Sequence, residues 1–239
     1  MGRFGRDFED LLPPPGASFW SVFAGGGLKF KFILIHFSTD CVFDGKKGEY
    51  VEEDPPNPIL LYSRQKMEIE IYLQKNCDRY CILRLAKVYG DVPGDKTLFT
   101  NWIDVLSNDV ETIKCAYDQR FSPIYVEDVV SGFISAVEKG LEGIYHLAGP
   151  RAHSRMELLE MFLCKYKKYN TLDVNVVGCS IHDFELPEKR PVDVSMKPDK
   201  FIAATGLVLS DTETISEQIL RNFYNQNNPI RTKKKNELV

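Results

Sequence analysis

The 239-residue chain has no long apolar segment and no excess of basic residues. Its longest largely apolar run, Phe32 to Phe37, has six residues, whereas a membrane-spanning helix needs about 20. Thirty lysines and arginines stand against 34 acidic residues, which gives a formal charge of −4. We therefore expect neither a membrane nor a nucleic acid as a partner. With 44% hydrophobic and 27% charged residues, the composition is that of a folded globular protein.

The sequence also has no cysteines and histidines at the spacing of a metal site, and its N-terminus does not have the pattern of a secretion signal. Only Cys77 and Cys81 of the six cysteines lie close together, and no histidine follows them at zinc-site spacing. We expect reduced thiols in a cytoplasmic protein and no bound metal. The N-terminus has no apolar stretch after its early arginines, and acidic residues follow instead (Asp7, Glu9 and Asp10), which argues against a signal or transit peptide.

The first 31 residues differ in composition from the rest. Residues 1–31 hold six of the 16 glycines, the run Pro13-Pro14-Pro15 and phenylalanines without a clear period. We expect an irregular segment there. The remaining boundaries follow from composition: one folded unit over residues 32–225 and a polar, lysine-rich tail over residues 226–239.

Helical and extended patterns alternate through the folded unit. The sequence predicts strands near 32–37, 81–85, 112–116, 144–147 and 174–177. It predicts a helix from about Pro58 to Lys75, with Asn57 as its cap. It predicts further helices near 98–106, near 129–137 up to Gly140, and after two capping boxes, Ser154 with Glu157 and Ser210 with Glu213. This alternation favours an α/β fold with a mainly parallel sheet. Ligands of such sheets bind beyond the carboxyl ends of the strands.

Two groups of polar residues suit chemistry at such a strand end. Ser38-Thr39-Asp40 follows the first buried strand, and Tyr62 and Lys66 lie four residues apart on the next predicted helix. An ammonium beside a phenol is expected to lower the pKa of Tyr62, which could then donate a proton to a carbonyl or accept one from an alcohol. The Tyr-x-x-x-Lys spacing also occurs by chance in many helices, so spacing alone leaves a purely structural role open.

Several ordered motifs carry a family resemblance. They are residues 38–45, 53–58, 62–66, 83–90, 118–123, 126–129, 143–147, 190–191 and 204–206. Together they resemble the dTDP-4-dehydrorhamnose reductase (RmlD-like) family, a branch of the extended short-chain dehydrogenase/reductases, over roughly residues 30–225. The resemblance implies a partial Rossmann-like parallel sheet with a smaller C-terminal lobe that binds a sugar nucleotide.

The resemblance also implies an activity and its residues. The activity is NADPH- or NADH-dependent reduction of a nucleotide-linked 4-keto sugar, as in dTDP-rhamnose biosynthesis. Thr39 corresponds to the catalytic hydroxyl, Tyr62 to the proton donor and Lys66 to the lysine that binds the cofactor's ribose. Asp40 is expected beside the reacting sugar.

Arg190 falls in the lobe that the resemblance assigns to the sugar nucleotide. A guanidinium offers a fixed fork of donors, which suits a phosphate or a base. A surface ion pair with Glu185 or Glu188 is the alternative that the sequence leaves open.

The sequence departs from the family pattern at its N-terminal side. A strand, a glycine-rich turn and a helix normally cradle the cofactor's pyrophosphate, but only 37 residues precede Ser38. Gly2 and Gly5 follow no predicted strand, and Gly25-Gly26-Gly27 precedes one. We expect the C-terminal two thirds of a reductase joined to an unrelated segment, which would cover the otherwise open edge of the strand around Ile33.

A second departure concerns the substrate. Lys87 stands where the rhamnose enzymes usually carry a tryptophan near the sugar. Gln119-Arg120-Phe121 also resembles the regulatory beta subunits of methionine adenosyltransferase, which are non-enzymatic relatives. The alternative function is therefore a non-catalytic module that binds a sugar nucleotide or regulates a partner and has lost its dinucleotide site.

Overall fold

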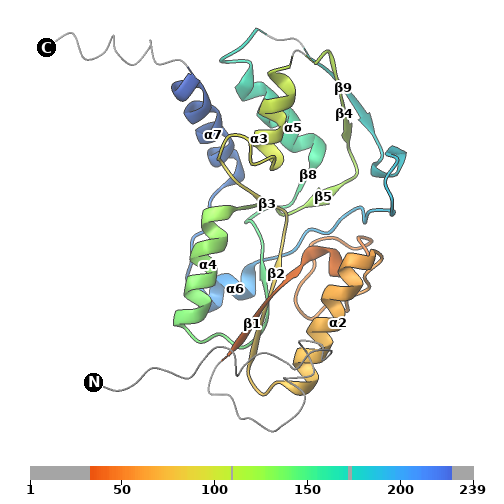
Figure 1. Ribbon diagram of the computed structural model, residues 1–239, viewed down its shortest axis with the longest axis vertical. Coiled ribbons are helices and arrows are strands. Elements are labelled where there is room, and N and C mark those ends of the chain that lie inside the picture. Colours follow the sequence, from red (N-terminus) through yellow and green to blue (C-terminus); the bar gives the residue numbers. More distant parts are fainter. Residues whose placement is uncertain (1–32, 109, 172–173, 228–239) are drawn as a thin grey trace, which may run out of the picture.

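The computed structural model of the protein describes residues 33–108, 110–171 and 174–227 (Figure 1). The expectations for the irregular segment 1–31, its glycines and its cover of the first strand lie outside these residues. So does the predicted polar tail, apart from its first two residues, which end the last helix. In the described part of the chain, no helix has the length and apolar character that a bilayer crossing requires.

The chain forms two lobes with separate apolar cores (Figure 1). We call the lower one in Figure 1 the sheet lobe and the upper one the helical lobe. The sheet lobe contains β1 (Leu34–Thr39), β2 (Tyr80–Leu85), β7 (Gly143–Leu147), α2 (Leu61–Asn76), α4 (Val126–Glu138) and α6 (Asp199–Thr205). The helical lobe contains α3 (Leu98–Leu106), α5 (Arg155–Tyr166), α7 (Thr212–Asn227), β4 (Thr112–Ala116) and β9 (Asn175–Cys179).

Short elements connect the lobes. Two-residue strands pair as β3 (Val88–Tyr89) with β6 (Ile124–Tyr125) and as β5 (Arg120–Phe121) with β8 (His153–Ser154). Single turns of 3-10 helix form η2 (Asp40–Val42) and η3 (Ile181–Asp183).

The sheet has the strand order β1-β2-β7, and every pairing is parallel. Thr39 lies opposite Leu85, which in turn lies opposite Leu147. The carboxyl ends of the three strands therefore meet at one edge, which faces the helical lobe (Figure 1). Helices α2 and α4 cover opposite faces of the sheet (Figure 1). This arrangement confirms the predicted α/β fold with a parallel sheet.

Helix α2 begins at Leu61, so the predicted start at Pro58 is wrong. Leu60 precedes the helix without a side-chain cap. The Asn57 amide, expected to cap it, instead donates to Asp44 Oδ2 at 3.0 Å. A residue far along the chain supplies an acceptor for the first turn of α2: the backbone N–H of Leu61 donates to Glu188 Oε1 at 3.0 Å.

One of the two predicted capping boxes is confirmed. The backbone N–H of Glu157 donates to Ser154 Oγ at 3.0 Å, and the Glu157 carboxylate accepts from the Ser154 N–H at 2.8 Å. The box at Ser210 is wrong. Its hydroxyl donates to Asp128 Oδ1 at 3.0 Å, while Asp211 accepts from an N–H in the first turn of α7.

We predict that Ser154→Ala lowers the free energy of unfolding by about 1 kcal/mol, because the first turn of α5 loses the acceptor for the Glu157 N–H. Ser154→Asp should retain most of the stability, since a carboxylate caps equally well. Urea unfolding measures both changes. Ser107→Ala is the matched control: its hydroxyl donates only to the carbonyl of Ile103 at the end of α3. Equal stability of the two alanine variants would contradict the prediction.

Candidate functional site

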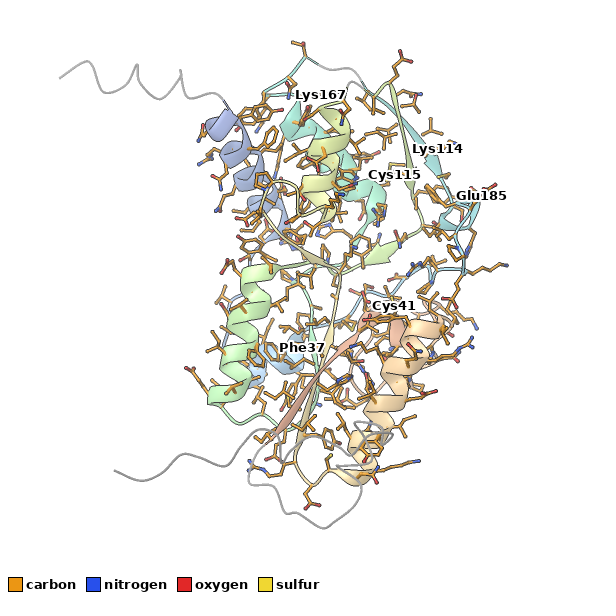
Figure 2. The ribbon with its side chains drawn as sticks, in the orientation of Figure 1. Phe37, Cys41, Lys114, Cys115, Lys167 and Glu185 are labelled. Carbon is orange, nitrogen blue, oxygen red and sulfur yellow. The ribbon has the colours of Figure 1, made fainter. Side chains whose placement is uncertain are left out.

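A cavity of about 780 Å³ lies between the two lobes. The sheet lobe contributes Thr39, Asp40 and Tyr62 to its wall, and the helical lobe contributes Trp102 and Lys114. Figure 2 shows its two sides: Cys41 lies on the sheet lobe, whereas Lys114 and Cys115 lie on β4 of the helical lobe. The carboxyl edge of the sheet thus opens into the cavity, as the strand-end rule predicts.

Thr39 and Asp40 meet at the end of β1, where the chain turns into η2. The Thr39 hydroxyl donates to Asp40 Oδ1 at 3.1 Å and accepts from the backbone N–H of Cys41 at 3.3 Å. Asp40 is only 7% exposed. Burial raises the pKa of Asp40 from 3.8 to about 6, and the bonds from Cys41 and Thr39 and the charge of Lys87 oppose this shift.

Tyr62 and Lys66 share one face of α2, as their spacing predicts. Tyr62 lines the cavity and is 52% exposed. Lys66 Nζ lies 5.9 Å from the centre of the Tyr62 ring and donates to the carbonyl oxygen of Phe37 at 2.8 Å. Lys66 thus lies behind Tyr62 and ties α2 to β1.

The expected effect of Lys66 on the phenol is wrong in this structure. Burial raises the pKa of Tyr62 above its ordinary value of 10, and the nearby Asp40 and Cys41 raise it further. The ammonium of Lys66 is directed to the carbonyl of Phe37 and does not offset these effects. Tyr62 is therefore a neutral phenol at pH 7, which suits a proton donor better than a base.

Four cationic side chains converge on the cavity: Lys87, Lys114, Arg155 and Arg190. None of them forms an ion pair within the described residues. Burial lowers the pKa values of Lys87 and Arg155, and the charge of Arg155 lowers that of Lys87 further. Among the residues that the structure describes, Asp40 is the only carboxylate in the cavity wall. The arrangement suits a ligand with more than one negative charge.

Of these four cations, the sequence predicts Arg190 as a ligand contact and shows Lys87 as a departure from the family pattern near the sugar. Arg190 lines the cavity as expected, and the alternative ion pair with Glu185 or Glu188 is absent from the described residues. Lys87 follows β2 by two residues, so the strand-end rule that selected Thr39 could have found it. Arg155 is held by Gln119, whose Oε1 accepts from Arg155 Nε at 2.7 Å, and no local pattern predicts that contact.

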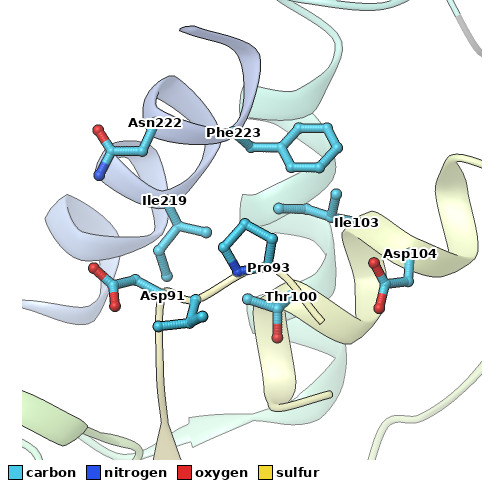
Figure 3. A pocket seen from close by; sticks show the side chains of 9 residues that line it. Asp91, Pro93, Thr100, Ile103, Asp104, Ile219, Asn222 and Phe223 are labelled. Carbon is cyan, nitrogen blue, oxygen red and sulfur yellow. The ribbon is translucent and has the colours of Figure 1, made fainter. Parts of the chain in front are cut away.

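A second cavity, of about 270 Å³, lies between α3 and α7 (Figure 3). Asp91 and Asp104 are its charged residues, and none of the predicted site residues lines it. Across the residues that the structure describes, no group of three histidine, cysteine or acidic side chains is placed to hold a metal ion. The interlobe cavity is the candidate site because it brings together Thr39, Asp40, Tyr62 and Arg190.

Comparisons with known proteins match nearly the same stretch of sequence as the family resemblance, which covers roughly residues 30–225. A sequence model of the RmlD substrate binding domain matches residues 22–225. Methionine adenosyltransferase 2 subunit beta of Xenopus tropicalis is 35% identical over 135 residues, which are 52% of this chain and 39% of that protein. The dTDP-4-dehydrorhamnose reductase of Sinorhizobium fredii is 26% identical over 195 residues, which are 78% of this chain and 65% of that protein.

A solved structure of similar fold is dTDP-4-dehydrorhamnose reductase from Bacillus anthracis in complex with NADP. It has a TM-score of 0.65 and 26% identity and covers 81% of this chain and 66% of that chain. This likeness confirms the expected Rossmann-like parallel sheet. The chain spans less than two thirds of the length of each of these three relatives.

The buried Asp40 predicts a pH-dependent cost in stability. Between pH 3.8 and about 6 the folded protein retains the Asp40 proton and the unfolded chain has lost it, so this group lowers stability as pH rises through that range. Asp40→Asn should therefore be more stable than the wild type at pH 7, by on the order of 3 kcal/mol, with little advantage at pH 3.5. Urea unfolding at several pH values measures the difference. A constant difference across this range would contradict the assignment.

Proposed function

The chain belongs to the family of RmlD substrate binding domains, and we propose that it binds a nucleotide-linked sugar between its lobes and reduces the 4-keto group of that sugar with NADPH or NADH. The unpaired cations of the cavity carry this proposal. A sugar nucleotide joins a diphosphate to two largely neutral groups, and such a diphosphate would neutralise the positive charge that Asp40 alone does not balance in the described wall.

The reacting end of the sugar is assigned to the carboxyl edge of the sheet. Tyr62 donates its proton to the carbonyl oxygen as the carbonyl is reduced. Thr39 Oγ1 donates a hydrogen bond to the same oxygen once its hydrogen turns away from Asp40. Asp40 then faces a sugar hydroxyl as an acceptor. Lys66 holds the first turns of α2 against β1 through its bond to Phe37, and the family resemblance assigns it to the ribose of the cofactor.

A nicotinamide cofactor fits the described residues in part. When bound, it supplies the hydride. Tyr62 and Lys66 fit its nicotinamide end, but no helix of the described chain follows a strand through a glycine-rich turn that would cradle the pyrophosphate. Of the two cofactors we favour NADPH over NADH, because the Bacillus anthracis relative was solved with NADP. The place in dTDP-rhamnose biosynthesis and the cytoplasmic location stay predictions.

We predict that Tyr62→Phe lowers the rate of NADPH-dependent reduction of a dTDP-4-keto sugar by about 100-fold or more, because the proton donor is lost while the ring remains. The KM for the sugar should change little. The assay is the loss of NADPH absorbance. Tyr80→Phe, at the amino end of β2, is the control and should retain the wild-type rate. Equal rates for Tyr62→Phe and the wild type would remove Tyr62 from the mechanism.

The second candidate is a non-catalytic module that binds a sugar nucleotide, as the methionine adenosyltransferase regulatory beta subunits suggest by their similarity. The lack of a glycine turn in the described chain favours it. Both candidates need the cationic cavity, but only the reductase needs the cofactor. A thermal shift with dTDP-glucose and none with NADPH would select this second candidate.

We predict that Arg155→Met weakens the binding of dTDP-glucose by about 10-fold or more, since the diphosphate loses one partly buried charge-assisted contact. Titration calorimetry at 50 and 200 mM salt measures the affinity, and its salt dependence should be smaller in the variant. Lys139→Met, at the end of α4 and away from the cavity, is the charge-matched control. Equal affinity of Arg155→Met and Lys139→Met would show that the diphosphate lies elsewhere.

A further inference from the structure

Three polar side chains form a buried row across the sheet, directly beneath the candidate site. Ser38 of β1 lies opposite Arg84 of β2, and Arg84 lies opposite His146 of β7. They are 3%, 2% and 0% exposed. In a parallel sheet, residues in register point to the same face, which here is the face under α2. Ser38 directly precedes Thr39, so the row lies one residue below the edge of the cavity.

A buried carboxylate of α2 completes this row. Glu70 is 0% exposed. Its Oε2 accepts from Arg84 Nη2 at 2.8 Å, and its Oε1 accepts from Arg84 Nε at 3.2 Å and from the Ser38 hydroxyl at 2.5 Å. One carboxylate thus joins α2 to both β1 and β2. We call Ser38, Glu70 and Arg84 the buried triad.

The surroundings of Arg84 leave Glu70 as its only carboxylate partner in the described chain. The guanidinium packs on the Phe43 ring, with its carbon 5.2 Å from the ring centre. Burial and the charge of Arg84 lower the pKa of His146 to about 3, so the imidazole beside Arg84 is neutral. Glu52 accepts from the backbone N–H of His146 and does not reach Arg84.

The position of Glu70 on α2 links the triad to the reacting groups. Glu70 lies four residues after Lys66 and eight after Tyr62, so the three side chains share one helix face. Lys66 bonds to the carbonyl of Phe37 and Glu70 bonds to Ser38, which are the two residues before Thr39. Two successive turns of α2 are therefore fixed to two successive residues of β1. The first turn of α2 has no side-chain cap from its own chain neighbours, which increases its dependence on these bonds.

A buried ion pair is a poor means of adding stability. Taking both charges out of water is costly, and apolar residues of similar volume usually stabilise a fold equally well. A carboxylate that bonds to two strands instead fixes the position of its helix on the sheet. Its hydrogen bonds set the distance and angle between helix and strands more narrowly than apolar packing does.

We propose that Ser38, Glu70 and Arg84 are positioning residues, which hold Tyr62 and Lys66 in register with Thr39 at the mouth of the cavity. This inference rests on the proposed reductase function. The triad itself lies beneath the cavity, and only Ser38 reaches its wall. The effect on the reaction is therefore indirect, through the distance between the Tyr62 hydroxyl and the sugar oxygen held by Thr39.

The double variant Glu70→Leu with Arg84→Met separates positioning from stability. Glu70→Gln alone should lose both stability and turnover, since it leaves the Arg84 charge buried without a counter-charge. The double variant should recover the free energy of unfolding, while kcat stays about 10-fold or more below wild type and the KM for the sugar nucleotide stays within about threefold. Lys165→Met, which removes a buried ammonium of α5 and its ion pair with the exposed Glu213 of α7, is the control and should lower stability without changing kcat.

Ser38→Ala and Ser63→Ala are a second, milder pair of variants. Both hydroxyls are buried, but Ser63 Oγ has no hydrogen-bond partner in the described chain. Ser38→Ala should lower kcat several-fold, and Ser63→Ala should not. Wild-type kcat in the double variant and in Ser38→Ala would show that the triad is only structural and would overturn the proposal.

A second measurement separates this proposal from the proposed function. If the wild type does not reduce a keto sugar, the reductase function fails. The positioning is then tested by amide hydrogen exchange over residues 38–42 and 61–66. Faster exchange there in the double variant, but not in Lys165→Met, supports the positioning role. Unchanged protection overturns it.

Discussion

The register between β1 and β2 is the constraint on which the candidate site depends. Because the two strands run parallel with Thr39 opposite Leu85, the residues that follow them emerge on one edge. Asp40 and Lys87 reach the same cavity for this reason, although 46 residues separate them in the sequence. A shift of one residue would turn every side chain of β1 to the other face and would separate Ser38 from the helix that covers it.

Features set by neighbouring residues could be predicted from the sequence. The apolar runs of β1 and β2, the helical spacing of α3 and the capping box at Ser154 each depend on side chains within a few positions of one another. The resemblance added the expectation that five residues serve one site: Thr39, Asp40, Tyr62, Lys66 and Arg190. Four of them line one cavity, whereas Lys66 lies behind Tyr62 and bonds to the carbonyl of Phe37. Their roles in a reaction remain proposals.

Features set by distant residues could not be predicted in this way. Asn57 was expected to cap α2 but bonds to Asp44, and Ser210 was expected to cap α7 but bonds to Asp128, 82 residues away. The cations of the cavity come from separate segments, so no local motif groups them. The raised pKa of Tyr62 depends on burial and on the charges around the folded site, which the four-residue spacing to Lys66 does not contain.

The cations that face the cavity come from both halves of the molecule. Lys87 extends from the sheet lobe and Arg155 from the helical lobe, and the charge of one lowers the pKa of the other. Asp40 offsets part of the Lys87 charge, and the remaining repulsion acts across the segments that join the two lobes. A bound anion would convert that repulsion into attraction across the gap. A ligand that binds more tightly through its negative charge should therefore also hold the two lobes more rigidly together.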